Sequence, residues 1–134
     1  MGCDIHITTE MLNEHDNKFY SFIGYGDDKF LSYNDCPRYR NYELFGVLAG
    51  VRRGGEDMIS EPRGIPKDAS TGYKEAAEAY GEDGHSHSYF LLSELFLHFD
   101  KIKSVSREFS NYMTWLMSLG IPFDQIRICF FFDN

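Results

Sequence analysis

The sequence predicts a single α+β domain over residues 1–134, with a small mixed or antiparallel sheet and helices packed mainly on one face. Three observations lead to this fold class. Residues 2–10 alternate between apolar and polar side chains, residues 126–132 are apolar at nearly every position, and two segments between them carry apolar stripes at helical spacing.

The first 39 residues predict two strands followed by an irregular stretch. In residues 2–10, Cys3, Ile5 and Ile7 share one face of a half-buried strand. The polar residues 11–17 predict a hairpin loop, and residues 18–23 a second strand. Residues 24–28 read as a turn. Residues 30–39 show no period, and Pro37 interrupts them.

A helix is expected after Asn41, which is a suitable N-cap, with Gly50 as its stop. Residues 52–72 form a long irregular stretch with three arginines, for which a mobile lid and a plain surface loop are both open. Residues 73–80 predict a short helix by propensity.

The last third predicts a strand, two helices and a strand. After a turn at residues 82–84, an extended stretch over residues 85–92 would place His85 and His87 on one face. Ser93 is expected to cap a helix over residues 94–99. A further helix follows at about residues 106–119. The last strand, residues 126–132, is apolar enough to be central in the sheet.

The charge distribution limits the partners. A formal net charge of −8 argues against binding of long nucleic acid, which needs a basic face. Five of the seven arginines nevertheless lie between Cys36 and Lys67, so an anion site is expected there. The candidate ligand-binding residues are Arg40, Asn41, Arg52, Arg53 and Arg63.

No stretch approaches the roughly 18 apolar residues of a membrane span. The start of the chain also lacks the basic and apolar residues of a signal peptide. We therefore expect a cytoplasmic protein without a membrane partner. Association of the chain with itself, as a homo-oligomer, is left open.

Histidines and carboxylates at strand ends are the candidate catalytic groups. Asp4 and His6 share one strand face, and His85 and His87 are expected to share another. If the two strands pair, two chemistries become available. In the first, His6, His85, His87 and Asp133 hold a divalent metal such as zinc or manganese, which activates water. In the second, the histidines act as acid and base on a phosphodiester, with Asp4 orienting an imidazole.

Five segments carry a resemblance to a known family. They are MGCDIH at the start, RNYELF, RGIP, DGHSHS and the terminal FFFDN. As a set, they look like a family of uncharacterised small phage and bacterial proteins that open with MGCDIH. The resemblance covers most of the chain and implies the same fold and a phage or bacterial context, but no catalytic assignment.

A second similarity is confined to the histidines. His6-Ile7-Thr8 is similar to the H-x-[ST] element of the two-histidine phosphoesterases, and His87 lies where their second copy is expected. The sequence departs from that pattern after His87, because Tyr89 stands at the third position, where the pattern has Ser or Thr. The similarity is therefore complete for the first element and partial for the second.

Three functions follow as hypotheses. The first is a hydrolase that acts on a small nucleotide-like phosphodiester through Asp4, His6, His85 and His87, in a phage counter-defence role. The second is a module that binds and sequesters such a nucleotide without turnover, using arginines for phosphate and aromatics for the base. The third is a structural or host-interaction protein with no small-molecule site.

Overall fold

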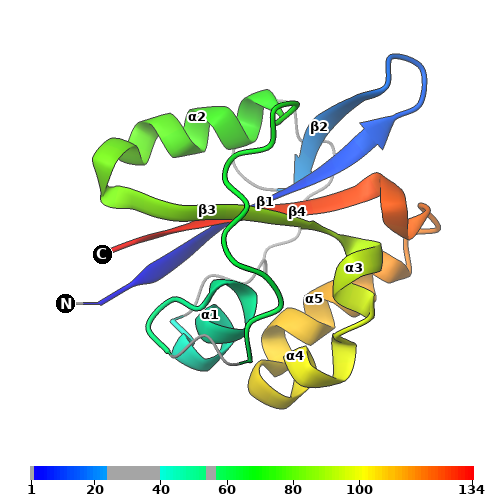
Figure 1. Ribbon diagram of the computed structural model, residues 1–134. Coiled ribbons are helices and arrows are strands. Elements are labelled where there is room, and N and C mark those ends of the chain that lie inside the picture. The colour runs from blue at the N-terminus through cyan, green and yellow to red at the C-terminus, as the bar shows by residue number, and fades with distance from the viewer. Residues whose placement is uncertain (1, 24–39, 54–56) are drawn as a thin grey trace.

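Four strands form one antiparallel sheet, in the order β2-β1-β4-β3, within the part of the chain that the computed structural model describes (Figure 1). That part comprises residues 2–23, 40–53 and 57–134. The strands are β1 (Asp4–Asn13), β2 (Lys18–Ile23), β3 (Gly84–Leu91) and β4 (Ile126–Asp133). The predicted turn at residues 24–28, the irregular residues 30–39 with Pro37, and Cys36 all lie outside it.

Helices cover both faces of the sheet unequally. The helices are α1 (Tyr42–Ala49), α2 (Thr71–Tyr80), α3 (Leu92–Phe96), α4 (Phe99–Val105) and α5 (Arg107–Met117), with 3-10 turns η2 (Gly81–Asp83) and η3 (Phe123–Gln125). In Figure 1, α1, α3, α4 and α5 lie below the sheet and α2 lies above it. The predicted α+β class, with helices mainly on one face, is confirmed. None of the described helices is long and apolar enough to cross a lipid bilayer.

The two faces bury two separate apolar clusters, and β4 contributes to both. Phe130 and Phe132 belong to the larger cluster, which the α1, α3, α4 and α5 side chains complete. Cys129 and Phe131 point to the opposite face and belong to the smaller cluster under α2, with Tyr73. Because successive side chains of a strand alternate between faces, a strand that is apolar at nearly every position can contribute to both clusters. The predicted central position of this strand is confirmed.

Local capping signals explain α1. The Asn41 side chain accepts a hydrogen bond from the Leu44 amide at 3.0 Å, as an N-cap should. Gly50 ends the helix with a φ of 71°, a left-handed conformation that glycine adopts without a Cβ clash. Both predicted ends of this helix are confirmed.

The capping prediction at Ser93 is wrong. The helix α3 begins two residues earlier than predicted, at Leu92, with Leu91 as its N-cap. The carboxylate of Glu94 accepts the Leu91 amide at 3.0 Å and so satisfies a free N–H group from within the first turn. The expected single helix over residues 94–99 also divides. Its first part ends at Phe96, and α4 starts at Phe99 and continues to Val105.

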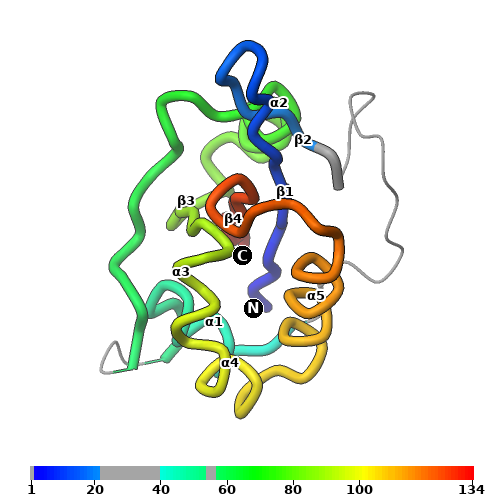
Figure 2. Tube along the Cα trace, turned by 90° about the vertical axis from the view of Figure 1, so that its right-hand side faces the viewer, coloured from blue at the N-terminus to red at the C-terminus, as the bar shows by residue number. Residues whose placement is uncertain are grey.

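Residues 57–70, which we call the strap, connect the α1 side of the sheet with α2. Figure 1 shows this coil crossing in front of β3, and Figure 2 shows it running along the outside of the sheet. The amide of Gly64 donates to the His87 carbonyl at 2.8 Å, and the amide of Arg63 donates to Ser88 Oγ at 3.1 Å. The strap therefore covers part of the free edge of β3.

Candidate functional site

The first residues of β1 and β3 and the last residues of β4 meet at one end of the sheet. Asp4 lies opposite Asp133 in the β1–β4 register, and Gly84 lies opposite Asp133 in the β3–β4 register. Both chain ends accordingly lie close together in Figures 1 and 2. We call this end the terminal rim. It comprises Asp4, His6, Arg40, Tyr80, His85, His87, Asp133 and Asn134.

Direct pairing of the two histidine-bearing strands, on which the sequence hypothesis depended, is not found. The strand β4 lies between β1 and β3 and pairs with both. His6 is thus opposite Phe131, and the ring of His87 stacks on the same Phe131 from the β3 side. The ring centroids of His6 and His87 lie 5.0 and 5.1 Å from that of Phe131. The two imidazoles share one sheet face, but a phenyl ring separates them.

At the terminal rim, His6 contacts a carboxylate and two aromatic rings. Its Nε2 contacts the Oδ2 of Asp133, and the two side chains are 21% and 20% exposed. A carboxylate accepts only, so Nε2 carries the proton of this contact, and in the neutral ring the lone pair lies on Nδ1. The imidazole also contacts two aromatic rings, with centroids 4.1 Å from Tyr80 and 5.0 Å from Phe131. The ring orientation and tautomer of His6 are therefore fixed by its surroundings.

Asp4 has a different partner from the one expected. It pairs with Arg40, whose Nε lies 2.7 Å from Oδ1 and whose second nitrogen lies 3.4 Å from Oδ2. This guanidinium lowers the pKa of Asp4 below its ordinary value. It also lies against Gly2, where a Cβ would overlap it. The expectation that Asp4 orients an imidazole is wrong, since Asp133 contacts His6 instead.

His85 and His87 do not share a face as predicted. Ser86 has a φ of 55°, and the β3–β4 register shifts between His85 and Ser88, so the segment contains a β-bulge. His85 consequently lies opposite Phe132, and its Nε2 lies 2.5 Å from the Asn134 side-chain oxygen. Burial, and secondarily the neighbouring His85, lower the pKa of His87 below its ordinary value of 6.5.

The proposed metal ligands do not converge. His6 contacts Asp133, His85 contacts Asn134, and His87 stacks on Phe131. Among the described residues, no group of three or more His, Cys, Asp or Glu side chains is arranged to hold a metal ion. Catalytic zinc sites use three protein ligands, and the described residues offer no such set at the terminal rim.

The candidate ligand-binding residues fall into two groups. Arg40 belongs to the terminal rim, and Arg52 lies next to it. Burial raises the pKa of the Cys3 thiol, and the nearby Arg52 guanidinium acts in the opposite direction. Asp133 and Asp4 are close enough to raise the same pKa slightly, so Arg52, Cys3 and the two carboxylates are neighbours. Arg52 also lies over the Tyr42 ring, 5.6 Å from its centroid.

The remaining candidates make contacts elsewhere. Arg53 is 3.9 Å from the Glu43 carboxylate on the surface of α1. Asn41 uses its oxygen for the helix cap and its nitrogen for the Val105 carbonyl at 2.8 Å. Arg63 donates to both carboxylate oxygens of Glu94, at 3.0 and 2.7 Å, so it fastens the strap to α3. A fifth arginine of the window, Arg38, lies outside the described residues.

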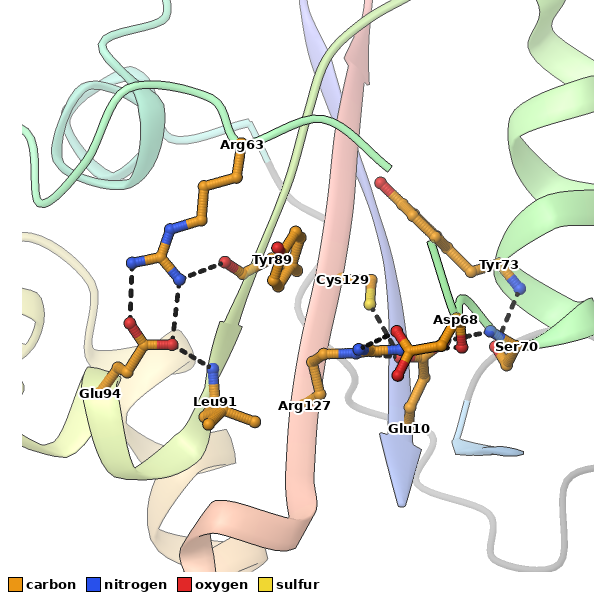
Figure 3. Close-up of polar contacts among 10 residues, drawn as sticks. All are labelled: Glu10, Arg63, Asp68, Ser70, Tyr73, Tyr89, Leu91, Glu94, Arg127 and Cys129. Carbon is orange, nitrogen blue, oxygen red and sulfur yellow. Dashed lines mark hydrogen bonds and ion pairs between the residues drawn. The ribbon is translucent and has the colours of Figure 1, made fainter. Parts of the chain in front are cut away.

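A buried ion pair that the sequence analysis did not identify lies under α2. Glu10 and Arg127 face each other in the β1–β4 register and are 0% and 5% exposed. Figure 3 shows the Glu10 carboxylate accepting three hydrogen bonds. The donors are Arg127 Nε at 2.5 Å, the Ser70 amide at 2.6 Å and the Cys129 thiol at 3.1 Å. A single arginine within the apolar run 126–132 was the available signal.

Arg127 has further partners that hold the strap. It donates to the Asp68 carboxylate at 2.8 Å and to the Asp68 carbonyl at 3.3 Å. Its guanidinium lies 3.8 Å from the centroid of the Phe19 ring. Buried charges that are paired and hydrogen-bonded in this way are typical of structural networks, so we assign the pair to the fold and not to chemistry.

A hollow of about 650 Å³ lies at the opposite end of the sheet from the terminal rim. The β1–β2 hairpin and the segment after α5 form its walls, with Leu12, Tyr20 and Ile121 among the lining residues. Glu14 and Gln125, which are hydrogen-bonded at 2.8 Å, lie at its edge. None of the predicted site residues lines this hollow.

Comparison of the chain with protein-family models, with curated proteins and with solved structures finds no match. The assignment of a function therefore depends on the geometry of the terminal rim.

Proposed function

We propose that the terminal rim hydrolyses the phosphodiester bond of a small nucleotide, with His6 as the acid–base group. The contact between His6 Nε2 and the Asp133 carboxylate carries this proposal. A carboxylate that accepts from one imidazole nitrogen fixes the tautomer, so that the other nitrogen can take a proton. The pair is also partly exposed, as a group that meets substrate must be.

The proposed mechanism uses this chain's residues only. His6 Nδ1 takes a proton from a water molecule as the water oxygen attacks phosphorus. Asp133 stabilises the imidazolium that forms, and the imidazolium then protonates the leaving oxygen as the ester bond breaks. Arg40 and Arg52 neutralise the phosphate charge, because guanidinium groups bind phosphate oxygens through two parallel hydrogen bonds. Binding would exchange the exposed Asp4–Arg40 pair for a phosphate–Arg40 pair.

His87 and His85 receive no proton-transfer step at the same phosphorus. Phe131 lies between His6 and His87, and the bulge at Ser86 directs His85 toward Asn134. A mechanism with one histidine and one carboxylate therefore agrees better with the contacts than the two-histidine mechanism.

Hydrolysis of a panel of cyclic and linear dinucleotides by the purified protein tests this proposal. Loss of an acid–base group lowers the rate by about 10²–10⁴-fold. We expect His6→Ala to lower kcat by about that factor, and Asp133→Asn to lower it as well. His15→Ala is the matched control, because His15 is exposed on the β1–β2 turn at the other end of the sheet, and it should leave kcat unchanged.

Two outcomes would replace the proposal. Recovery of intact nucleotide from the denatured protein, with no product, would establish the sequestering module. Absence of both binding and product would establish a structural or host-interaction protein. Elemental analysis of the same preparation checks for zinc and manganese, and a stoichiometric metal that His6→Ala abolishes would contradict the metal-free mechanism.

The cellular setting belongs to the same proposal. We infer action in the cytoplasm on a small signalling nucleotide, as in phage counter-defence, because the net charge of −8 is unfavourable for long nucleic acid. Self-association is checked by light scattering of the same preparation.

A further inference from the structure

Tyr80 is an aromatic residue that contacts the proposed acid–base group and is partly exposed to solvent. It is the last residue of α2, and its ring centroid lies 4.1 Å from that of His6. The ring also meets Phe131 edge-on, with centroids 5.4 Å apart. The residue is nevertheless 38% exposed, unlike the fully buried Tyr73, which lies about two turns earlier on the same helix. Tyr80 thus has one side on the catalytic imidazole and another at the surface.

Backbone packing under this ring is close. A Cβ at Gly84 would lie 3.3 Å from Phe131 Cδ2 and 3.5 Å from Tyr80 Cβ. A side chain at this position would be tight against the Phe131 ring, so glycine lets β3 pack there without displacing that ring. The ring of Tyr80 is held at the terminal rim by its contacts with His6 and Phe131.

An exposed aromatic ring and a guanidinium at the same rim match the two halves of a nucleotide. Purine and pyrimidine bases stack on aromatic side chains, and each such contact contributes about a tenfold change in affinity. Arg40, which is paired with Asp4 at this rim, is the guanidinium that the proposed function assigns to the phosphate. In a duplex the base faces are covered by their neighbours, so this arrangement favours a free or single-stranded nucleotide.

We infer that Tyr80 is a substrate-contacting residue that stacks on the base next to the cleaved phosphodiester, and that it selects small nucleotides with an unpaired base over base-free phosphodiesters. This inference rests on the proposed function for its catalytic meaning. The contact between ring and base is open to test without any turnover.

The test compares adenosine monophosphate with ribose 5-phosphate, which has the same phosphate and sugar but no base. Dissociation constants are measured by calorimetry for the wild-type protein and for Tyr80→Ala, Tyr80→Phe and Tyr80→Trp. We expect the wild type to bind the nucleotide about tenfold more tightly than ribose 5-phosphate, in line with one stacked base. Tyr80→Ala should remove that difference, while Tyr80→Phe and Tyr80→Trp should keep it. Tyr20→Ala, another exposed tyrosine, is the matched control and should change neither constant.

The outcomes separate this inference from the proposed function. Equal affinity of the wild type for the two ligands, or an unchanged preference in Tyr80→Ala, overturns the inference even if dinucleotides are hydrolysed. A preference that depends on Tyr80 without any hydrolysis overturns the proposed function and supports the inference. Absence of binding of both ligands overturns both. Circular dichroism of each variant shows whether a loss of binding comes from misfolding, and the Tyr80→Phe variant decides the question if Tyr80→Ala does not fold.

Discussion

A single backbone dihedral at Ser86 determines where two imidazoles of the terminal rim lie. Its φ of 55° is in the left-handed region, which residues other than glycine, asparagine and aspartate seldom adopt. The Ser86 hydroxyl lies 3.0 Å from His85 Nδ1, so the strained residue also contacts a neighbouring imidazole. Strained residues of this kind cluster at functional sites, which agrees with a role for the rim beyond stability.

The pKa of His87 predicts a pH dependence of stability. Burial lowers this pKa in the folded state below the ordinary value of 6.5. Between the folded pKa and about 6.5, the unfolded chain therefore binds more protons at this site, and the free energy of unfolding rises with pH. Above that window the stabilisation from the buried, neutral His87 is fully present. It is lost as the pH falls through the folded pKa. Urea denaturation of the wild type and of His87→Gln between pH 5 and pH 8 measures this, and the variant should show a smaller slope.

The exposed His15 provides the control for this experiment. Substitution His15→Gln should leave the pH slope of the wild type in place. A His87→Gln variant with an unchanged slope would contradict the assigned cause.

At the scale of elements, α1 and β3 show what the sequence could and could not predict. The ends of α1 were predictable, since Asn41 and Gly50 act within one turn of the helix. The bulge in β3 was not, because Ser86 carries no local signal for a positive φ and its conformation depends on pairing with β4. The same holds for the strand order, which places β4 between the two histidine-bearing strands.

Site residues divide in the same way. His6 and Asp133 were predictable as polar groups at strand ends, but their contact depends on the register between β1 and β4. Tyr80 was read only as part of a helix, because its place over His6 follows from how α2 packs on the sheet. Glu10 and Arg127 looked like single charges in strands, and only cross-strand pairing makes them an ion pair.

Arg63 is predicted to act on the strap and not on phosphate. Its guanidinium joins Glu94 through two hydrogen bonds and donates to the Tyr89 carbonyl at 3.2 Å. Arg63→Ala should lower the free energy of unfolding by about 1 kcal/mol, as expected for a partly exposed ion pair. It should also speed hydrogen exchange at the Gly64 amide, which bonds to His87. Binding of adenosine monophosphate should stay unchanged.

The contrasting variant is Arg40→Ala, in which phosphate binding should weaken while exchange at Gly64 stays as in the wild type. Weaker nucleotide binding in Arg63→Ala would return Arg63 to the ligand-binding residues. Exchange and calorimetry on the two variants thus separate an anchor from a phosphate contact.

At the scale of the whole molecule, the sheet divides the interior into two apolar clusters of unequal size. The larger contains residues of β1, β3, β4 and four helices, and the smaller contains five fully or nearly buried residues under α2. The Glu10–Arg127 pair lies on the side of the smaller cluster and connects two strands with the strap and the start of α2. Polar contacts therefore complete the attachment of α2 where apolar area is small.

Arg127→Met is predicted to destabilise the whole domain. Removal of one partner leaves the Glu10 carboxylate buried without its counter-charge, which costs about 3–5 kcal/mol. Arg107→Met is the matched control, because Arg107 is exposed at the start of α5, and its effect should stay within about 0.5 kcal/mol. Urea denaturation of the two variants measures the difference. Equal stabilities would mean that the pair contributes nothing to the fold.

The position of β4 has a consequence for how the chain is made. Ribosomes release a protein from its first residue onward, and β4 is the last of the four strands to emerge, yet it is the neighbour of both β1 and β3. Until residues 126–133 are outside the exit tunnel, the β1–β2 hairpin and β3 have no partner strand to join them. Pairings between segments so distant in sequence slow folding. The nascent chain therefore stays without the four-stranded sheet, and without the histidine–carboxylate contact, until β4 has emerged.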